Sequence, residues 1–309
     1  MTAKKSLTMR PKEQEISQNI QEIDFASLPE QTLAKDGRLS LQELYRKFNE
    51  LLKSGWTGQK ISSQEISVAG EEITVPIFAF FSPACQTKEA LETVVIAGIH
   101  GTEPAGPNAF AQYLETLIKI GSQEGVLVMP MGNPYGYYQN ESRNPDNVSV
   151  GDSDHLLGRA PEPACREADE ITSFLMGLGE RIGPETKVID LHEDNFGEDR
   201  ESHVDSVGTY VYVHGERADR NPLALKIVKM LKRNLHPIIM EGETREKEKI
   251  SGGMVINTED GSIDQLLTER LGAGLAIVLE TYILPDNDPP LEERIEIHLE
   301  ALNIFFGRS

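Results

Sequence analysis

The sequence is constrained most by a series of short, mostly apolar runs, each about as long as one β-strand. They span residues 94–99, 126–131, 187–191, 209–213 and 275–279. Continuous apolar runs of this length are typical of strands that are buried on both faces. A sheet made of such strands has helices on both sides, so the runs favour an α/β architecture.

Helical patterns separate most of these runs. Residues 41–52 place Leu41, Leu44 and Phe48 on one face, with Ser40 in the position of an N-cap. Further helices are predicted over 107–120, 167–178, 222–234, 263–271 and 291–305, and a hairpin over 64–81. Strands that alternate with helices predict an α/β fold with a mixed, mostly parallel central sheet flanked by helices.

No internal repeat or linker divides the chain of 309 residues. Residues 1–38 are polar and show little periodicity, so we expect a flexible or loosely packed N-terminal extension. Residues 39–309 are expected to form a single domain. Within it, residues 132–162 are rich in Gly, Asn, Pro, Asp and Ser and predict a long functional loop.

Charge and cysteine content argue against several classes of protein. The formal net charge is −20, which would repel a phosphate backbone or an anionic membrane surface, so we expect neither nucleic acid nor membrane as a partner. The N-terminus lacks the apolar stretch of a secretory signal. Two cysteines are too few for a disulfide scaffold. These features favour a cytoplasmic protein, and none predicts an oligomeric state.

A histidine and a glutamate follow the first apolar run. His100 comes directly after residues 94–99, at the strand end where α/β sheets place their ligands, and Glu103 lies three residues further on. This turn directs an imidazole and a carboxylate to one point, and zinc accepts both. A glutamate at a helix N-terminus can also simply be stabilised by the helix dipole.

A second histidine, His192, follows residues 187–191. Together with His100 and Glu103 it would supply two nitrogen ligands and one oxygen ligand, the number that a catalytic zinc site needs. Taken alone, His192 could be a core histidine whose neighbours satisfy it. Asp190 is either a carboxylate that orients a ligand or a residue that turns into the sheet.

Glu280 closes the apolar run 275–279. Burying an ionised carboxylate there is costly unless it has a partner or a task. Beside a water whose pKa is lowered by a metal, such a carboxylate could act as a general base.

The segments HGTEPAG, GNPYGY, IDLHED, GSID and VLET occur in this order, with Arg143 between the second and the third. This order resembles the zinc carboxypeptidase superfamily (M14-like), which includes the succinylglutamate desuccinylase and aspartoacylase branch. The resemblance covers about residues 92–285 and implies a zinc carboxypeptidase-like catalytic domain over residues 39–309.

The resemblance also implies roles for particular residues. His100, Glu103 and His192 would bind one Zn²⁺ per chain, and Glu280 would be the general base. Arg143 matches the arginine that polarises the scissile carbonyl, since a fixed cation stabilises the developing negative charge. The substrate-binding residues implied by the resemblance, some of them altered here, are Asn133, Asp154, His155 and Ile263.

Two departures from the superfamily stand out, and the first concerns substrate recognition. Asp154 and His155 stand where the family carries an Asn-Arg pair that grips the terminal carboxylate of the substrate. An aspartate would repel a carboxylate, and a histidine is only partly charged at neutral pH. The interval between Glu103 and His192 is also closer to that of the acylase branch.

We therefore expect a zinc-dependent hydrolase of an amide or peptide bond, metallocarboxypeptidase-like, with altered recognition of the terminal carboxylate. One alternative is an N-acyl amino acid deacylase of the desuccinylase or aspartoacylase kind. Another is a non-catalytic zinc- or ligand-binding protein on the same fold. The partner would be a small peptide or an N-acyl amino acid.

Overall fold

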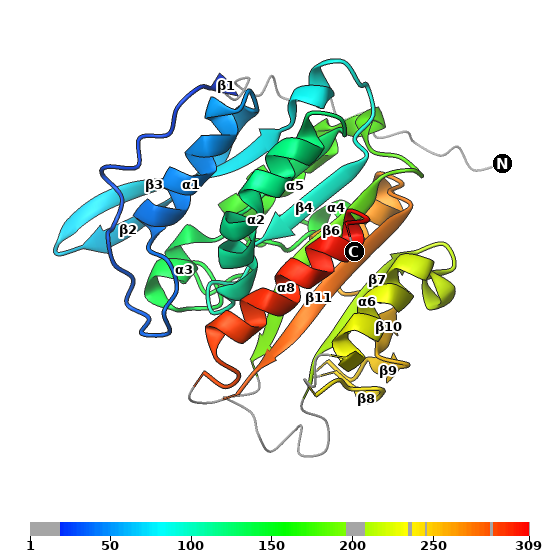
Figure 1. Cartoon of the computed structure of the whole chain (residues 1–309). Coiled ribbons are helices and arrows are strands. Elements are labelled where there is room, and N and C mark those ends of the chain that lie inside the picture. Colours follow the sequence, from blue (N-terminus) through cyan, green and yellow to red (C-terminus); the bar gives the residue numbers. More distant parts are fainter. Residues whose placement is uncertain (1–18, 196–207, 234–236, 245, 285–286, 309) are drawn as a thin grey trace.

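The structure is a computed structural model that describes residues 19–195, 208–233, 237–244, 246–284 and 287–308 (Figure 1). Its strands are β1 (Asn19–Ile20), β2 (Thr57–Val68), β3 (Glu71–Phe81), β4 (Thr93–Ala97), β5 (Val126–Met129), β6 (Lys187–Asn195), β7 (Tyr210–Gly215), β8 (Glu241–Glu243), β9 (Lys249–Ser251), β10 (Met254–Ile256) and β11 (Leu275–Ile283). Its main helices are α1 (Leu41–Lys53), α2 (Ala105–Gly121), α3 (Pro134–Gln139), α4 (Asp154–Leu157), α5 (Arg166–Gly177), α6 (Pro222–Arg233), α7 (Ile263–Gln265) and α8 (Leu291–Phe305).

The strands form one mixed sheet in the order β1-β2-β3-β5-β4-β6-β11-β7-β10-β9-β8. Strands β5, β4, β6 and β11 run parallel at its centre, and β7 pairs antiparallel with β11. The predicted mixed α/β sheet is confirmed, with its parallel pairs concentrated at the centre. Towards the edges lie the antiparallel hairpins β2–β3 and β8–β9, because short turns can join only antiparallel strands.

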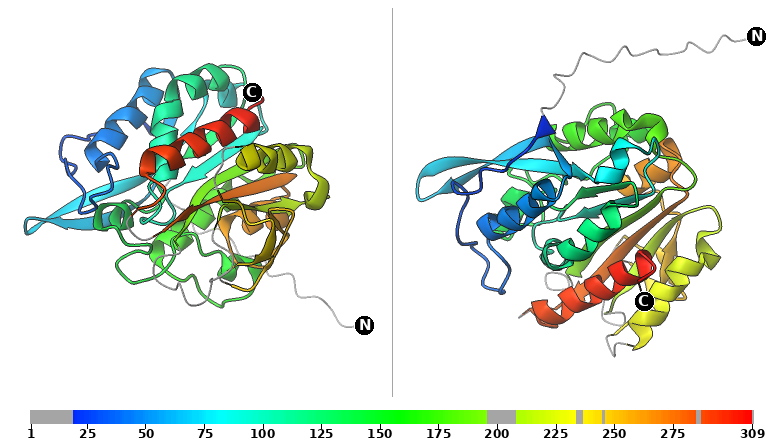
Figure 2. Two further views of the ribbon diagram at one scale, coloured as in Figure 1. Left: turned by 60° about the horizontal axis from the view of Figure 1, so that its bottom comes forward. Right: turned by 45° about the horizontal axis from the view of Figure 1, so that its top comes forward.

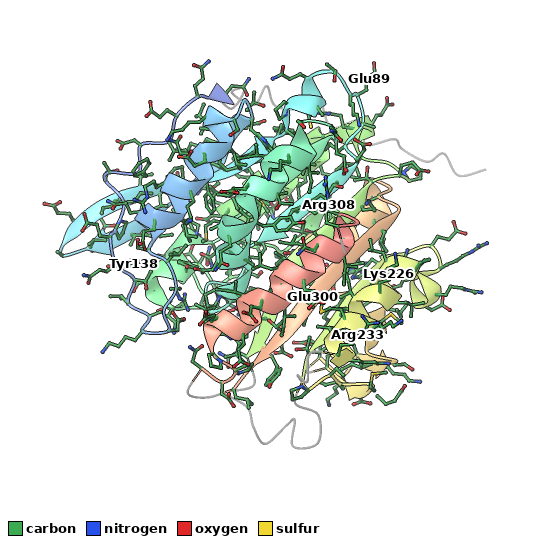
Figure 3. All side chains as sticks on the ribbon, viewed as in Figure 1. Glu89, Tyr138, Lys226, Arg233, Glu300 and Arg308 are labelled. Carbon is green, nitrogen blue, oxygen red and sulfur yellow. The ribbon has the colours of Figure 1, made fainter. Side chains whose placement is uncertain are left out.

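Helices cover both faces of the sheet (Figures 1 and 2). On β4, Val95 and Ala97 pack into the core under α1, α2, α6 and α8, whereas Val94 and Ile96 pack into a second core with α5 and α7. This two-residue alternation explains why the strand is apolar throughout. Charged side chains of α6 and α8, including Lys226, Arg233 and Glu300, point away from the sheet (Figure 3).

Local signals in the sequence explain the helix boundaries. The predicted N-cap Ser40 accepts a hydrogen bond from the backbone N–H of Glu43 at 3.2 Å, and the Glu43 carboxylate accepts one from the backbone N–H of Ser40 at 2.9 Å. This capping box starts α1. The predicted loop 132–162 contains the short helices α3 and α4, and the predicted helix 263–271 is α7 followed by a π-helical turn, Leu266–Arg270.

The expected N-terminal extension packs on the domain where the structure describes it. Residues 1–18 lie outside the described residues, but Ile23 and Leu28 are buried in the main core. Arg38 is also buried, and its Nη1 donates to the carbonyl oxygens of Gly101 at 2.8 Å and Tyr137 at 2.9 Å. Ile23 and Leu28 thus hold this polar stretch against the core, and Arg38 connects it to the turn after β4.

None of the described helices is both long and apolar enough to cross a membrane.

Gly101 lies where the turn after β4 meets α3. A Cβ atom built at Gly101 would lie 1.9 Å from the carbonyl carbon of Gly136. Both groups are backbone, so neither can rotate away as a side chain would. The close approach therefore requires a residue without a side chain next to His100.

We expect Gly101→Ala to lower the free energy of unfolding by about 1–3 kcal/mol, the usual range for inserting an atom into a packed site. Urea unfolding measures this change. Gly177→Ala is the matched control, because a Cβ there meets no atom within 4 Å, and it should leave stability nearly unchanged. Equal stability of the two variants would contradict the steric interpretation.

Candidate active site

The predicted ligands meet at the carboxyl ends of the central parallel strands. His100 and Glu103 lie in the turn between β4 and α2, and His192 lies in β6. Glu280 is in β11, and the register of the sheet sets it beside His192. The structure extends both strands beyond their predicted ends, so His192 and Glu280 are paired residues within the sheet.

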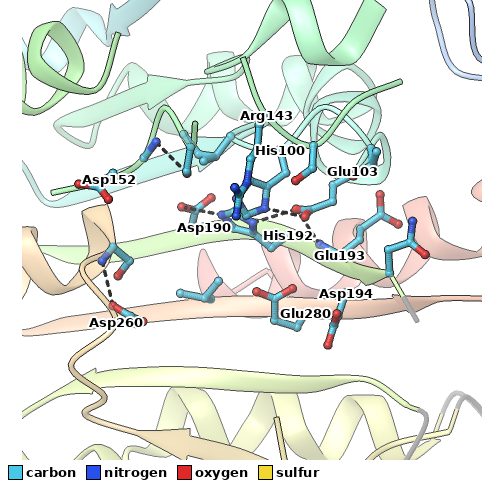
Figure 4. Close-up of a pocket in the computed structure, with 18 of the residues that line it drawn as sticks. His100, Glu103, Arg143, Asp152, Asp190, His192, Glu193, Asp194, Asp260 and Glu280 are labelled. Atoms are coloured by element: carbon cyan, nitrogen blue, oxygen red, sulfur yellow. Dashed lines mark hydrogen bonds and ion pairs between the residues drawn. The ribbon is translucent and has the colours of Figure 1, made fainter. Parts of the chain in front are cut away.

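Glu103 bridges the two histidines. Its Oε1 lies 2.7 Å from Nδ1 of His100, and its Oε2 lies 2.8 Å from Nδ1 of His192 (Figure 4). Candidate ligand atoms of the three side chains all lie within 4.8 Å of one another. Glu103 and His192 are buried, whereas the His100 side chain remains about one-third exposed. The three groups therefore face one point at the edge of the sheet.

Asp190 fixes the orientation of His192. Its Oδ2 lies 3.2 Å from Nε2 of His192, on the side of the ring opposite Glu103. The two residues are two apart on β6, so their side chains emerge on the same face of the strand. When Asp190 accepts the Nε2 proton, Nδ1 keeps its lone pair, which is the arrangement that metal-binding histidines usually show.

This donor set fits a divalent metal ion. Two imidazole nitrogens and a carboxylate are the ligands of many catalytic zinc sites. Here both nitrogens are directed at the carboxylate, and Asp190 supports one of the imidazoles from behind. The three side chains can therefore hold a metal ion.

The electrostatics of the cluster follow from its burial and its mixed charges. Burial would raise the pKa of Glu103, but the charges of His100 and His192 outweigh burial and hold that pKa at about 2. For His192, burial is outweighed by the negative charges of Asp190 and Glu103, which raise its pKa well above the usual value. The cluster is thus a carboxylate that cationic partners stabilise.

The pKa of Glu280 is shifted in the direction opposite to that of Glu103. Burial raises its pKa well above the ordinary value, His192 opposes this effect, and neighbouring carboxylates such as Glu103 add to it. Glu280 lines the same cleft as the three candidate ligands. A carboxyl with a raised pKa beside a cationic site is suited to take up a proton and release it.

Glu193 connects β6 to the helices α2 and α8. Because side chains alternate along β6, Glu193 points to the face opposite His192, where it forms a buried ion pair with Arg294 of α8. Its Oε2 also accepts a hydrogen bond from the backbone N–H of Ala105, at the start of α2, at 2.6 Å. The Glu193 backbone N–H donates to Oε2 of Glu103 at 3.1 Å.

These supporting residues were missed by the sequence reasoning. The alternation after His192 could have placed Glu193 on the helix side, but no local signal pairs it with an arginine 101 residues away. Arg38 was missed because it belongs to a stretch that was expected to be loose.

The cleft has a volume of about 860 Å³, and two further predicted residues line it. Arg143 is exposed, and its Nη1 donates to the carbonyl oxygen of Asn147 at 3.2 Å. Ile263 is buried at the start of α7. Arg143 is the single lysine or arginine in the lining that the structure describes.

Three predicted substrate-binding residues lie outside this lining. Asn133 is fully buried and caps α3, since its Oδ1 accepts from the backbone N–H of Gly136 at 3.0 Å. The Asp154 carboxylate lies 3.5 Å from Arg159, and the His155 ring lies 3.5 Å from the Thr172 hydroxyl. These three side chains shape loops, and Asp152 lines the cleft in place of its neighbours.

Carboxylates dominate one end of the cleft. Asp152, Asp260 and Asp264 line it together with Asp190. Asp264 is buried, and burial, followed by the charge of Asp190, raises its pKa well above the usual value. No sequence pattern identified these acids as neighbours, because they come from a loop, a strand, the approach to α7 and α7 itself.

No family model matches the chain, and a comparison with curated proteins finds no match either. Solved structures do match. A candidate metallopeptidase from Shewanella amazonensis is 22% identical, with a TM-score of 0.66 over 86% of this chain and 91% of that chain. Another from Shewanella baltica is 19% identical, with a TM-score of 0.69 over 85% and 90%.

A metallo-carboxypeptidase from Burkholderia cenocepacia is 13% identical, with a TM-score of 0.53 over 88% of this chain and 69% of that chain. At these identities the likeness concerns the fold. The resemblance to the zinc carboxypeptidase superfamily is therefore confirmed as a resemblance of fold: this chain has the α/β fold of metallopeptidases and metallo-carboxypeptidases.

Proposed function

We propose that this protein is a zinc-dependent hydrolase of an amide or peptide bond, metallocarboxypeptidase-like, in which His100, Glu103 and His192 hold one Zn²⁺ per chain. One observation carries the proposal: two Nδ1 atoms face the two oxygens of a single buried carboxylate, and Asp190 occupies the other nitrogen of His192. The shared fold with proteins named as metallopeptidases supports the class of reaction.

The chain's own residues then have distinct tasks. Zinc, when bound, would polarise the scissile carbonyl and lower the pKa of a water. Glu280 would take a proton from the attacking water and pass it to the leaving nitrogen. The guanidinium of Arg143 donates to the carbonyl oxygen as negative charge develops on it. Asp190 and Glu193 hold His192 and Glu103 in place.

Recognition of the substrate differs from that of a carboxypeptidase with an Asn-Arg clamp. Asp154 and His155 lie outside the cleft, and Arg143 is the single lysine or arginine in its described lining. If Arg143 serves the carbonyl oxygen, no second arginine or lysine among these residues is left for a terminal carboxylate. The cleft therefore supports the altered recognition that the sequence predicts.

We expect His192→Ala to lose zinc, because the site keeps only two ligands and a catalytic zinc needs three. Metal analysis of the purified protein after dialysis measures zinc per chain. His155→Ala is the matched control, since it removes another mostly buried histidine that lies outside the cleft. Retention of one zinc per chain in His192→Ala would refute the ligand assignment.

Zinc binding should release about one proton at pH 7. The pKa of His192 is raised well above its ordinary value, so the imidazole is protonated before the metal binds, whereas Glu103 is already ionised. Zinc must displace that proton, and its affinity should fall as the pH decreases. Calorimetry in buffers of different ionisation enthalpy measures the proton count. Release of no proton would contradict this protonation state.

We expect Glu280→Gln to reduce turnover by roughly 10²–10⁴-fold, the usual contribution of a positioned base, with zinc content unchanged. Assays with blocked peptides that have free C-termini, and with N-acyl amino acids, measure turnover. Activity on N-acyl amino acids alone would favour the deacylase alternative. Zinc-dependent turnover that is lost in Glu280→Gln excludes the non-catalytic alternative, whereas full activity in the variant removes Glu280 as the base.

A further inference from the structure

The acidic end of the cleft consists of Asp152, Asp190, Asp260 and Asp264. In Figure 4, Asp152 and Asp260 lie on the side of Asp190 that is away from Glu103. The acidic end therefore extends away from Glu103, and its member Asp190 contacts the candidate ligand His192. The proposed reaction uses Asp190 to orient His192 and gives no task to the other three acids.

Two of these acids are buried, and each has one carboxylate oxygen without a hydrogen-bond partner among the described residues. Asp190 is 1% exposed and Asp264 is 2% exposed, and Oδ1 of each has no hydrogen-bond partner among the described residues. Buried polar atoms in folded proteins are nearly always hydrogen-bonded. Two unsatisfied oxygens on residues that line one cleft therefore indicate a donor that the described residues do not supply.

The described basic side chains near the cleft do not supply that donor. Arg143 donates to Asn147, and Arg159 faces Asp154 at 3.5 Å and Glu259 at 3.9 Å. His214 lies 3.8 Å from Asp260, beyond hydrogen-bonding distance. His192 faces Oδ2 of Asp190 at 3.2 Å, so among the described residues Oδ1 of Asp190 and Oδ1 of Asp264 are left without a donor.

An organic cation fits the acidic end better than a second metal ion. Among the described residues, His100, Glu103 and His192 form the group whose candidate ligand atoms lie within 4.8 Å of one another, and the four aspartates form no such group. A guanidinium or ammonium carries several donors and can reach carboxylates that are further apart. Ile263 and Val278 also line the cleft and offer apolar contact to an aliphatic stem.

We propose that the substrate carries a primary ammonium or guanidinium group, and that this group binds at the acidic end by donating to Asp190 and Asp264. This inference rests on the proposed hydrolase function for its reaction, but its recognition step can be tested by binding alone. In this proposal the protein recognises a cationic group of the substrate instead of a terminal carboxylate. The cationic group belongs to the part of the substrate that leaves when the bond is cleaved.

The test compares substrates that differ in charge but hardly in shape. Zinc-loaded protein is assayed with blocked dipeptides that end in arginine or in its uncharged analogue citrulline, and in lysine or norleucine. We expect kcat/KM to favour the cationic member of a pair by about tenfold or more, because charge-assisted hydrogen bonds are the stronger ones. The two pairs distinguish a guanidinium from an ammonium preference. Equal cleavage within both pairs overturns the inference and leaves the hydrolase proposal standing.

Binding measurements distinguish the cation-recognition proposal from the hydrolase proposal when the protein cleaves none of these substrates. Calorimetry with zinc-loaded Glu280→Gln protein measures the affinity for argininamide and citrullinamide, and for lysinamide and norleucinamide, without turnover. If the wild-type protein cleaves none of the substrates but the variant prefers a cationic amide, cation binding at the acidic end is supported and the hydrolase proposal fails. Binding of neither cationic amide above its neutral analogue overturns the inference.

Variants assign the effect to the acidic end. Asp264→Asn should reduce the ratio of kcat/KM for the cationic and the neutral substrate by about tenfold. Asp154→Asn removes the same charge at the start of α4, outside the cleft, and should leave this ratio unchanged. Asp152→Asn offers a second variant at a half-buried lining position, where the ratio should also fall if Asp264→Asn does not fold. A ratio that survives in folded Asp264→Asn and in Asp152→Asn places the cation elsewhere and overturns the assignment.

Discussion

The site depends on one buried carboxylate that two histidines share. Glu103 is 7% exposed, and the desolvation of such a group would exclude its ionised form if Nδ1 of His100 and of His192 did not face its two oxygens. The same interaction holds two strands and a turn at fixed positions. A metal ion that replaced the shared protons would meet ligands already in place, so little conformational freedom would be lost on binding.

Behind this carboxylate lies a second charged layer on the other face of the sheet. Glu193 pairs with Arg294, and both are essentially inaccessible to solvent. A buried ion pair is weak evidence for stability, but losing one partner leaves an uncompensated charge and is strongly destabilising. Glu193 also accepts from the start of α2 and so connects β6 to the helix that follows Glu103. Strand alternation thus lets one segment, residues 190–193, serve the cleft and the helical layer.

Most of the fold was predictable because its signals are local. The apolar runs, the capping box at Ser40 and the helical periodicities act within a few residues of the chain, and the structure contains elements at these positions. The meeting of His100, Glu103 and His192 was predictable because strand ends in a parallel sheet share one edge. Asp154 and His155 show the limit, because the resemblance to the superfamily implied a substrate-binding position for them and the structure places them outside the cleft lining. The orientation of loop side chains depends on contacts such as those with Arg159 and Thr172, which no local pattern specifies.

The clustering of acids in the cleft is best understood as an electrostatic balance. Buried carboxylates are tolerated when they are protonated, paired or bound to cations. Glu103 has its histidines and Glu193 has Arg294, whereas Asp190 and Asp264 each keep an unsatisfied oxygen. A divalent ion at the histidines would offset part of the charge but would lie on one side of Asp190. The remainder faces the open cleft, where the charge of an incoming molecule can balance it. The same carboxylates would repel an acidic ligand, so charge that the described residues leave unbalanced would favour cationic over acidic molecules.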